Sequence, residues 1–203
     1  MSWQLALFRI RRAVIALLFG TLSACVGPAR EDVSSFSSIG GNEIVVVGRI
    51  DLVPPLRKGE QKLEGIGTGK LENKIFVIAD DHYRVLKQEP GVADYTGRVE
   101  ATIGQTFFVR SRDKSFFILG AMMYLEIGGA RHEMIYFPGG LKVTVKPGDR
   151  AIYIGTLRYE RNEFFEITKA NIVDEFNRAN VEFQRKFGKK VPLRKSLMTV
   201  VKG

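Results

Sequence analysis

The chain has 203 residues, a formal net charge of +9 and one cysteine. A single cysteine excludes a disulfide bond within the chain, so the fold must rest on packing, and this length suits one domain that buries about two thirds of its unfolded surface. The basic balance favours an anionic neighbour, such as lipid phosphates, cell-wall carboxylates or an acidic protein.

The N-terminus has the pattern of an export signal. Arg9, Arg11 and Arg12 precede the apolar run Ala13–Leu18, and no acidic residue lies among them. A basic segment followed by a short apolar core is typical of secretory signals. The apolar core of about ten residues is too short for a membrane-spanning helix, which needs about 20. An uncleaved membrane helix, or an ordinary secretory signal with a chance cysteine, remains the alternative.

The residues that follow, Leu22-Ser23-Ala24-Cys25, resemble the lipobox of bacterial lipoproteins. The resemblance implies cleavage before the cysteine, diacylglycerol attached to its sulfur and an acylated amino group. A protein with two or more acyl chains is held stably at a membrane. Residue 26 is Val and not the Asp that commonly retains such proteins in the inner membrane. The resemblance therefore implies an outer-membrane lipoprotein that faces the periplasm or the cell surface.

Val26–Asn42 is rich in serine and glycine, which form flexible coil, so we expect a tether between lipid and domain. Packing of Phe36 and Ile39 on the domain is the alternative. The β-branched runs Ile44–Val47 and Ile75–Ile78 then predict strands that are covered on both faces.

A glycine-rich segment, Gly65–Lys70, lies between these two runs and faintly resembles a phosphate-binding loop. Such a loop needs Ser or Thr after its lysine and a helix behind it. Leu71 and another strand follow instead, which favours a plain turn.

From Gly97 onward the chain alternates between apolar and polar residues, with turn signals roughly every dozen residues. The turns are expected at Arg112–Ser115, Gly128–Gly129, Pro138–Gly140, Pro147–Asp149 and Glu160–Asn162. We therefore predict a mainly β fold, an antiparallel β-sandwich or barrel-like meander.

One amphipathic helix is predicted near the C-terminus, beginning after Asp174 as N-cap and ending at Gly188. Its apolar face comprises Phe176, Ala179, Phe183 and Phe187, at helical spacing. Its opposite face carries Arg178, Glu182, Arg185 and Lys186.

Three aromatic pairs lie on predicted strands: Phe107-Phe108, Phe116-Phe117 and Phe164-Phe165. Neighbours on a strand point to opposite faces, so each pair places one ring in the core and one on the other face. Either the helix covers these outer rings, which we favour, or they form an exposed platform for sugars or a partner.

No catalytic or metal motif stands out. The two histidines, His82 and His132, are flanked by acidic residues but lack the spacing of zinc ligands, and no GxSxG segment occurs. We therefore predict a protein that is not an enzyme and has no cofactor and no metal. An enzyme would need a cleft that gathers one of these histidines with carboxylates.

The basic C-terminal segment is the better candidate for a binding surface. Lys189, Lys190, Arg194 and Lys195 are predicted to meet an anionic partner, either a phosphate-bearing lipid or an acidic protein. The apolar residues between them indicate that the segment adds an edge strand or folds on a partner.

The stretch Gly148–Leu157, in which a Pro-Gly turn precedes Tyr153-x-Gly155, loosely resembles small exported lipoproteins with immunoglobulin- or transthyretin-like sandwiches. The expected organisation is a signal peptide (1–24), a lipidated tether (25–42), a β-sandwich domain with its helix (43–188) and a basic segment (189–203). The expected function is a lipid-anchored, non-catalytic binding or scaffold domain in a cell-envelope assembly, with an envelope protein, lipopolysaccharide or the cell wall as partner. A glycan- or cell-wall-binding module is the alternative, and nucleic acid is not an expected partner.

Overall fold

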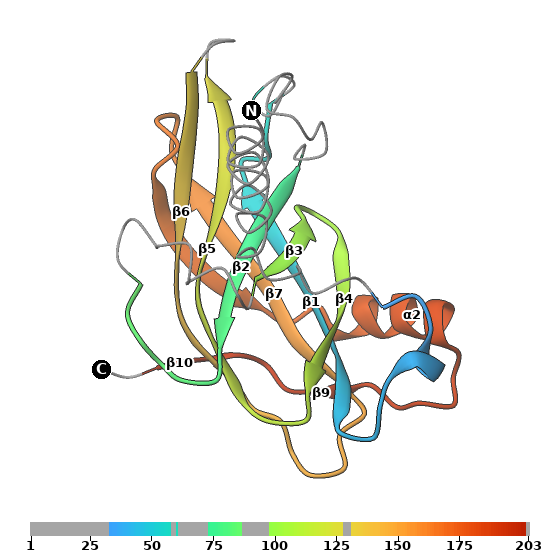
Figure 1. Ribbon diagram of the computed structural model, residues 1–203. Helices are drawn as coiled ribbons and strands as arrows, with labels where there is room; N and C mark the ends of the chain where they lie inside the picture. Colours follow the sequence, from blue (N-terminus) through green and yellow to red (C-terminus); the bar gives the residue numbers. More distant parts are fainter. Residues whose placement is uncertain (1–32, 58–59, 61–72, 87–97, 128–130, 202–203) are drawn as a thin grey trace, which may run out of the picture.

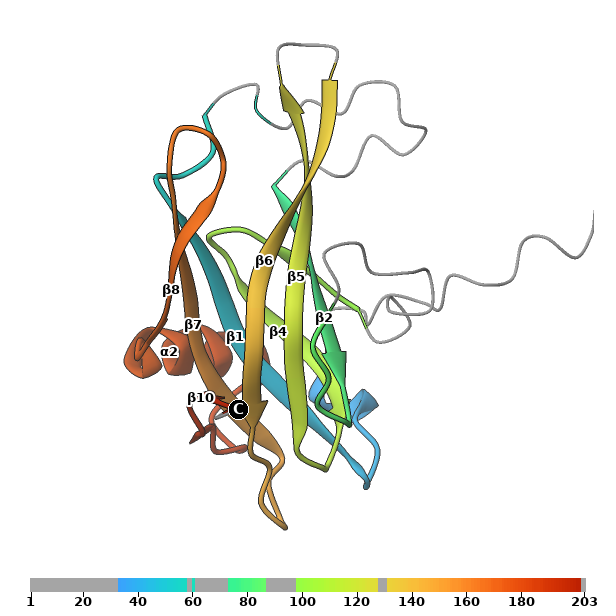
Figure 2. The ribbon, with the colours of Figure 1, turned by 90° about the vertical axis from the view of Figure 1, so that its left-hand side faces the viewer.

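The computed structural model describes residues 33–57, 60, 73–86, 98–127 and 131–201. Two sheets pack face to face, and one helix lies outside them (Figures 1 and 2). The predicted mainly β sandwich with one helix near the C-terminus is confirmed. The predicted signal, Cys25 and the Gly65–Lys70 loop lie outside the described residues.

The first sheet has the order β4 (Thr106–Arg112), β1 (Glu43–Val53), β7 (Ala151–Arg161) and β8 (Ile167–Val173), with β9 (Arg194–Lys195) also beside β7. The second sheet has the order β10 (Thr199–Val200), β6 (Arg131–Val143), β5 (Phe116–Ile127), β2 (Lys74–Asp80) and β3 (Val99–Thr102). The helix α2 (Phe176–Phe187) and the short 3-10 helix η1 (Phe36–Ser38) complete the described elements.

The sheets are not wholly antiparallel, in contrast to the predicted meander. β1 and β7 run parallel, as do β7 and β9. The first predicted strand, β1, therefore pairs with a strand that follows about a hundred residues later in the chain. The pairing begins at Val45 with Ala151 and ends at Val53 with Glu160. Turn spacing predicts only which consecutive strands can form hairpins, so it gave no sign of this pairing.

The alternating stretch after Gly97 is divided between the two sheets. β3 belongs to the second sheet and β4 to the first, and the turn between them contains Gly104 with φ +75°. The Gly104 N–H donates to the Ile50 carbonyl of β1 at 2.7 Å. The turn therefore lies beside the C-terminal half of β1, where it forms one wall of the pocket described below.

Pro138–Gly140, predicted as a turn, lies inside the long strand β6. The pairing of β5 with β6 shifts register here, between Ile118 and Gly120. A Cβ atom on Gly139 would lie 2.2 Å from the backbone carbon of Leu119. The glycine thus allows a close backbone approach at a bulge, and the strand continues beyond it.

The described residues form two apolar cores. One lies between the sheets, and the other lies between the first sheet and α2 (Figure 2). β1 serves both, because Ile44 and Val46 face the second sheet while Val45 and Val47 face the helix. This double burial is what the β-branched run predicted.

The predicted flexible tether does not extend to residue 42. Val33 and Ile39 are buried in the core beneath α2, and the Phe36 ring contacts Phe183 edge-on at 6.4 Å between centroids. The Val33 N–H also donates to the Phe108 carbonyl at 2.7 Å. Residues 33–42 therefore belong to the folded domain, as the alternative expectation for Phe36 and Ile39 stated.

The C-terminal segment adds edge strands to both sheets. β9 pairs with β7, and β10 pairs with β6. Leu193 is buried in the core beneath α2, and Met198 is buried between the sheets. Of the two expectations for this segment, the edge strand is confirmed.

The helix begins at Phe176 and ends at Phe187, before Gly188, as predicted. Its N-terminus differs by one residue, since Glu175 occupies the cap position without a side-chain capping bond. Asp174 still contributes, because its Oδ1 accepts the Phe176 N–H at 3.1 Å. Within the part of the chain that the structure describes, no helix is both long and apolar enough to cross a bilayer.

Candidate functional site

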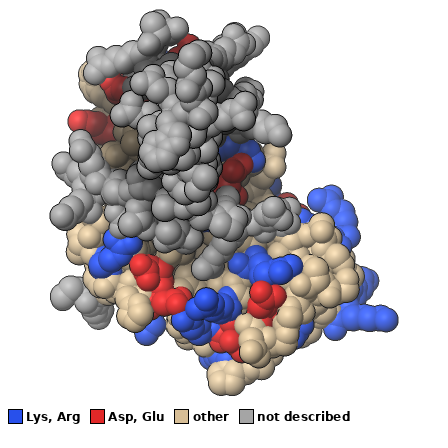
Figure 3. Space-filling model, viewed as in Figure 1, with Lys and Arg blue, Asp and Glu red and all other residues tan. Residues whose placement is uncertain are grey.

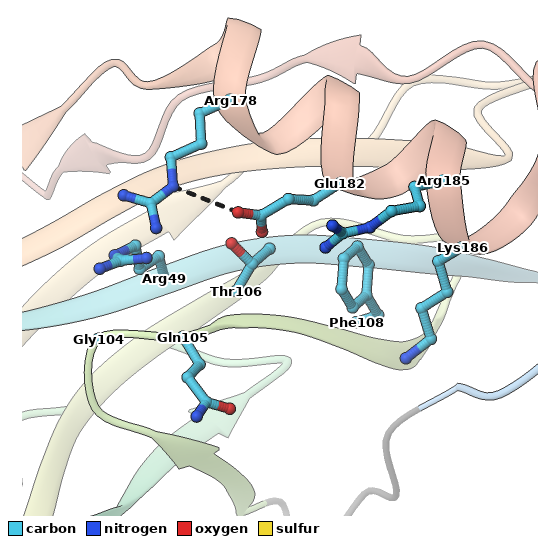
Figure 4. A pocket seen from close by; sticks show the side chains of 9 residues that line it. All are labelled: Arg49, Gly104, Gln105, Thr106, Phe108, Arg178, Glu182, Arg185 and Lys186. Atoms are coloured by element: carbon cyan, nitrogen blue, oxygen red, sulfur yellow. Dashed lines mark hydrogen bonds and ion pairs between the residues drawn. The ribbon is translucent and has the colours of Figure 1, made fainter.

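A pocket of about 530 Å³ lies between α2 and the first sheet (Figure 4). Its size falls within the range of small-molecule sites, about 300–1,000 Å³. Four cationic side chains and one carboxylate line it, together with polar and aromatic groups. The lining residues are Arg49, Gly104, Gln105, Thr106, Phe108, Arg178, Glu182, Arg185 and Lys186.

Strand alternation on β1 explains why the pocket is polar. The residues that face the helix side are Val45 and Val47, followed two residues later by Arg49 and then Asp51. The apolar pair lies in the core beneath α2, and the charged pair lies beyond it. The apolar core under α2 therefore ends where Arg49 begins the pocket.

β4 contributes the second wall by the same alternation. Thr106 and Phe108 line the pocket, whereas Phe107 packs against the core between the sheets. The Phe108 ring contacts Phe187 of the helix at 5.5 Å, and the Lys186 ammonium lies 4.6 Å from its centroid. The ring and the lysine thus form one end of the pocket (Figure 4).

The predicted charged face of the helix supplies the third wall. Arg178, Glu182, Arg185 and Lys186 all line the pocket, and Figure 4 shows the Arg178 and Glu182 side chains side by side above the sheet. The Arg178 Nε donates to Glu182 Oε1 at 3.2 Å. The charged face of α2 therefore lines a pocket rather than being only a solvated surface.

Glu182 is held in its ionised form. Burial alone would raise the pKa of this carboxyl, but the hydrogen bond from Thr106, the bond from Arg178 and the charges of Arg178 and Arg49 hold the pKa below its usual range. The carboxylate therefore interacts with arginines from two different elements, α2 and β1.

Asp51, two residues along the same face of β1, holds Arg49 in place. The Arg49 Nε donates to Asp51 Oδ1 at 2.6 Å, and Arg158 contacts the other carboxylate oxygen at 3.1 Å. Burial acts to raise the pKa of Asp51, but hydrogen bonds from the two arginines hold it below its usual range. Arg49 therefore enters the pocket from β1 with its position set by an ion pair.

The four basic residues predicted to bind an anionic partner divide into two pairs. Lys189 and Lys190 are exposed just beyond α2, and Figure 3 shows Lys and Arg side chains projecting at the right-hand edge, where α2 lies in Figure 1. Arg194 instead contacts Asp149, and Lys195 contacts Asp174 at 2.8 Å. The structure therefore does not present the four as one open patch.

The aromatic pairs are mostly covered. Phe108 is buried under α2, Phe116 is buried between the sheets, and the Phe117 ring lies 5.7 Å from that of Tyr83. Among the rings of the three pairs, Phe164 alone is exposed, with 74% of its surface accessible. These pairs therefore do not form the exposed platform that a glycan-binding face would use.

His82 does not line the pocket. His82 is exposed, and its backbone N–H donates to Asp80 Oδ1 at 3.1 Å, while the side chain of His132 lies outside the described residues. Across the described ranges, no group of three or more His, Cys, Asp or Glu side chains is arranged to hold a metal ion.

Arg49, Gln105 and Thr106 were not expected to be functional residues. The alternation of Val45, Val47 and Arg49 showed that one face of β1 changes from apolar to charged. It did not show that the apolar face of α2 covers β1 only as far as Arg49, because the helix follows more than a hundred residues later. The signal was present, but its meaning depended on the packing.

No protein-family model matches the chain, and neither does any curated protein or solved structure. The pocket and the N-terminal sequence are therefore the observations from which a function follows.

Proposed function

We propose that the protein is a lipid-anchored cell-envelope protein that acts as a non-catalytic binding or scaffold domain in an envelope assembly. The observation that carries this proposal is the convergence of cationic side chains from α2 and β1 on one pocket that holds a single carboxylate. Such a surface suits an anionic component of the envelope.

The groups in the pocket favour binding over catalysis. General acid–base chemistry works best with a group that exchanges its proton near neutral pH. Glu182 stays ionised for the reasons given above, and the other charged groups in the lining are three guanidinium groups and one ammonium group. The pocket therefore offers charge and hydrogen bonds, which bind and orient a ligand.

The N-terminal sequence supports the lipid anchor. The lipobox-like residues end at Cys25, and the folded domain begins by Val33, whose N–H is bonded to Phe108. Eight residue steps of fully extended chain span at most about 28 Å, at roughly 3.5 Å per residue. A lipid on Cys25 would therefore hold the domain close to the bilayer surface.

The test of the anchor is metabolic labelling of the full chain and of Cys25→Ser with radioactive palmitate in a Gram-negative host, followed by membrane fractionation and N-terminal sequencing. We expect the unaltered chain to be labelled, to begin at residue 25 and to fractionate with outer membranes. The variant should lose the label. A purified chain that keeps its first 24 residues and takes up no label would overturn the proposal.

A further inference from the structure

The pocket beneath α2 has three guanidinium groups, from Arg49, Arg178 and Arg185, and one ammonium group, from Lys186. Arginine presents a planar fork of donors that matches the oxygens of phosphate, and several cations around one site suit a dianion better than a single carboxylate. The pocket therefore has the donor set of a phosphate site.

Two of these arginines are anchored in a way that leaves their outer donors available to a ligand. In the described contacts Arg49 donates through Nε to Asp51, and Arg178 donates through Nε to Glu182. The Arg49 Nη2 atom lies 3.8 Å from the position that a Cβ on Gly104 would take, so it faces the pocket wall. Each carboxylate thus holds its arginine through Nε and leaves the two terminal nitrogens for a ligand. This arrangement lowers the entropic cost of binding.

The pocket also lies next to the point where the anchor joins the domain. The Val33 N–H is bonded to the Phe108 carbonyl, and Phe108 lines the pocket. With a lipid on Cys25, the tether keeps Val33, the residue bonded to this wall of the pocket, within about 28 Å of the bilayer surface, at roughly 3.5 Å per residue. The anions present there at highest density are the phosphate groups of lipids.

We propose that this pocket binds the phosphate headgroup of an anionic membrane lipid, with the terminal nitrogens of Arg49, Arg178 and Arg185 as its donors. This inference rests on the proposed lipid anchor. Its consequence is a second, specific attachment that sets the orientation of the domain on the membrane, with α2 and the β3–β4 turn facing the headgroups.

The test is calorimetric titration of the full lipidated chain, purified in a neutral detergent, with short-chain phosphatidic acid below its micelle concentration and at about 0.15 M salt. The site variant is Arg178→Gln with Arg185→Gln. The matched control is Lys142→Gln with Lys146→Gln, which removes the same charge from exposed residues outside the pocket. We expect the site variant to lose affinity about tenfold or more and the control to lose less than about twofold.

Arg185→Gln alone is a second variant, because this exposed side chain can be changed without breaking the Arg178–Glu182 pair. It should lose part of the affinity while its thermal unfolding midpoint stays unchanged. Equal losses in the site and control variants, or no binding of phosphatidic acid at all, would overturn the inference.

Two further probes distinguish between the possible sources of the anion. Glycerol 3-phosphate should bind more weakly than the lipid, and comparable binding would assign the pocket to a soluble phosphate ester instead. Tighter binding of a hexaglutamate peptide would assign it to an acidic protein and overturn the phosphate inference. That result leaves the proposed envelope function standing, whereas failure of palmitate labelling removes the anchor itself.

Discussion

Arg194 donates two parallel hydrogen bonds to Asp149, from Nε to Oδ1 at 2.6 Å and from Nη2 to Oδ2 at 2.5 Å. The Asp149 side chain is only 7% exposed, and Arg194 also donates to the Thr144 carbonyl at 3.1 Å. This pair of hydrogen bonds links β9 to the connection between β6 and β7. Because β6 belongs to the second sheet and β7 to the first, the C-terminal segment is held where the chain passes from one sheet to the other.

Replacement of Arg194 by Ala should therefore destabilise the fold. We expect a loss of about 2 kcal/mol in the free energy of unfolding, because charge-assisted hydrogen bonds are removed from a nearly buried carboxylate. Arg194→Lys keeps the charge but not the two-pronged geometry and should lose part of this amount. Urea unfolding measures both, and an unchanged midpoint for Arg194→Ala would show that this pair of hydrogen bonds contributes nothing.

The same pair predicts a pH dependence. The hydrogen bond from Arg194 holds the pKa of Asp149 below its ordinary value of 3.8. A carboxyl with a depressed pKa stabilises the fold above the unfolded value and loses this contribution as the pH falls through the folded one. The difference in unfolding free energy between the unaltered chain and Arg194→Ala should shrink between pH 7 and about pH 3. A difference that stays constant over this range would contradict the assignment.

The bulge in β6 predicts a severe effect of a single methyl group. A Cβ atom on Gly139 would lie 2.2 Å from the Leu119 backbone carbon, so Gly139→Ala forces β5 and β6 apart. We expect a loss of about 3 kcal/mol or more in unfolding free energy. Gly41→Ala is the control, since nothing lies within 4 Å of its added Cβ, and should change stability by no more than about 0.5 kcal/mol. Similar midpoints for the two variants would contradict the close approach.

The two halves of the basic C-terminal segment should behave differently. Lys189→Ala with Lys190→Ala changes exposed side chains and should leave unfolding free energy within about 0.5 kcal/mol, while it weakens the salt-sensitive association of a non-lipidated chain with envelope membranes. Arg194→Ala with Lys195→Ala should lower stability, because it removes the contacts to Asp149 and Asp174. Urea unfolding and co-fractionation measure the two effects separately. Unchanged co-fractionation after loss of Lys189 and Lys190 would remove these residues from the binding surface.

Local patterns in the sequence predicted the elements well. The helix ends before Gly188, the Pro147–Asp149 turn separates β6 from β7, and the run at Val45–Val47 is covered on both faces, as expected. Each of these features depends on residues that are neighbours in the chain, such as the 3.6-residue period of a helix or the backbone freedom of a turn.

Long-range pairing was not predicted in the same way. Pro138–Gly140 has the composition of a turn, yet Leu119 on the neighbouring strand determines that it is a bulge. Arg194 and Lys195, predicted to meet an anionic partner, contact Asp149 and Asp174, which lie 45 and 21 residues away in the chain, although Lys195 stays exposed. Neither partner could be identified from composition alone.

The sequence by itself determined the strands, the amphipathic helix and the lipobox-like start, because periodicity and short motifs depend on residues close together in the chain. Only the tertiary structure decided that β1 runs parallel to β7, that the C-terminal segment joins both sheets, and that Arg49 meets Arg178 across one pocket. Those relationships bring together residues that lie 42 to 129 positions apart in the chain, and packing, not local propensity, selects such contacts.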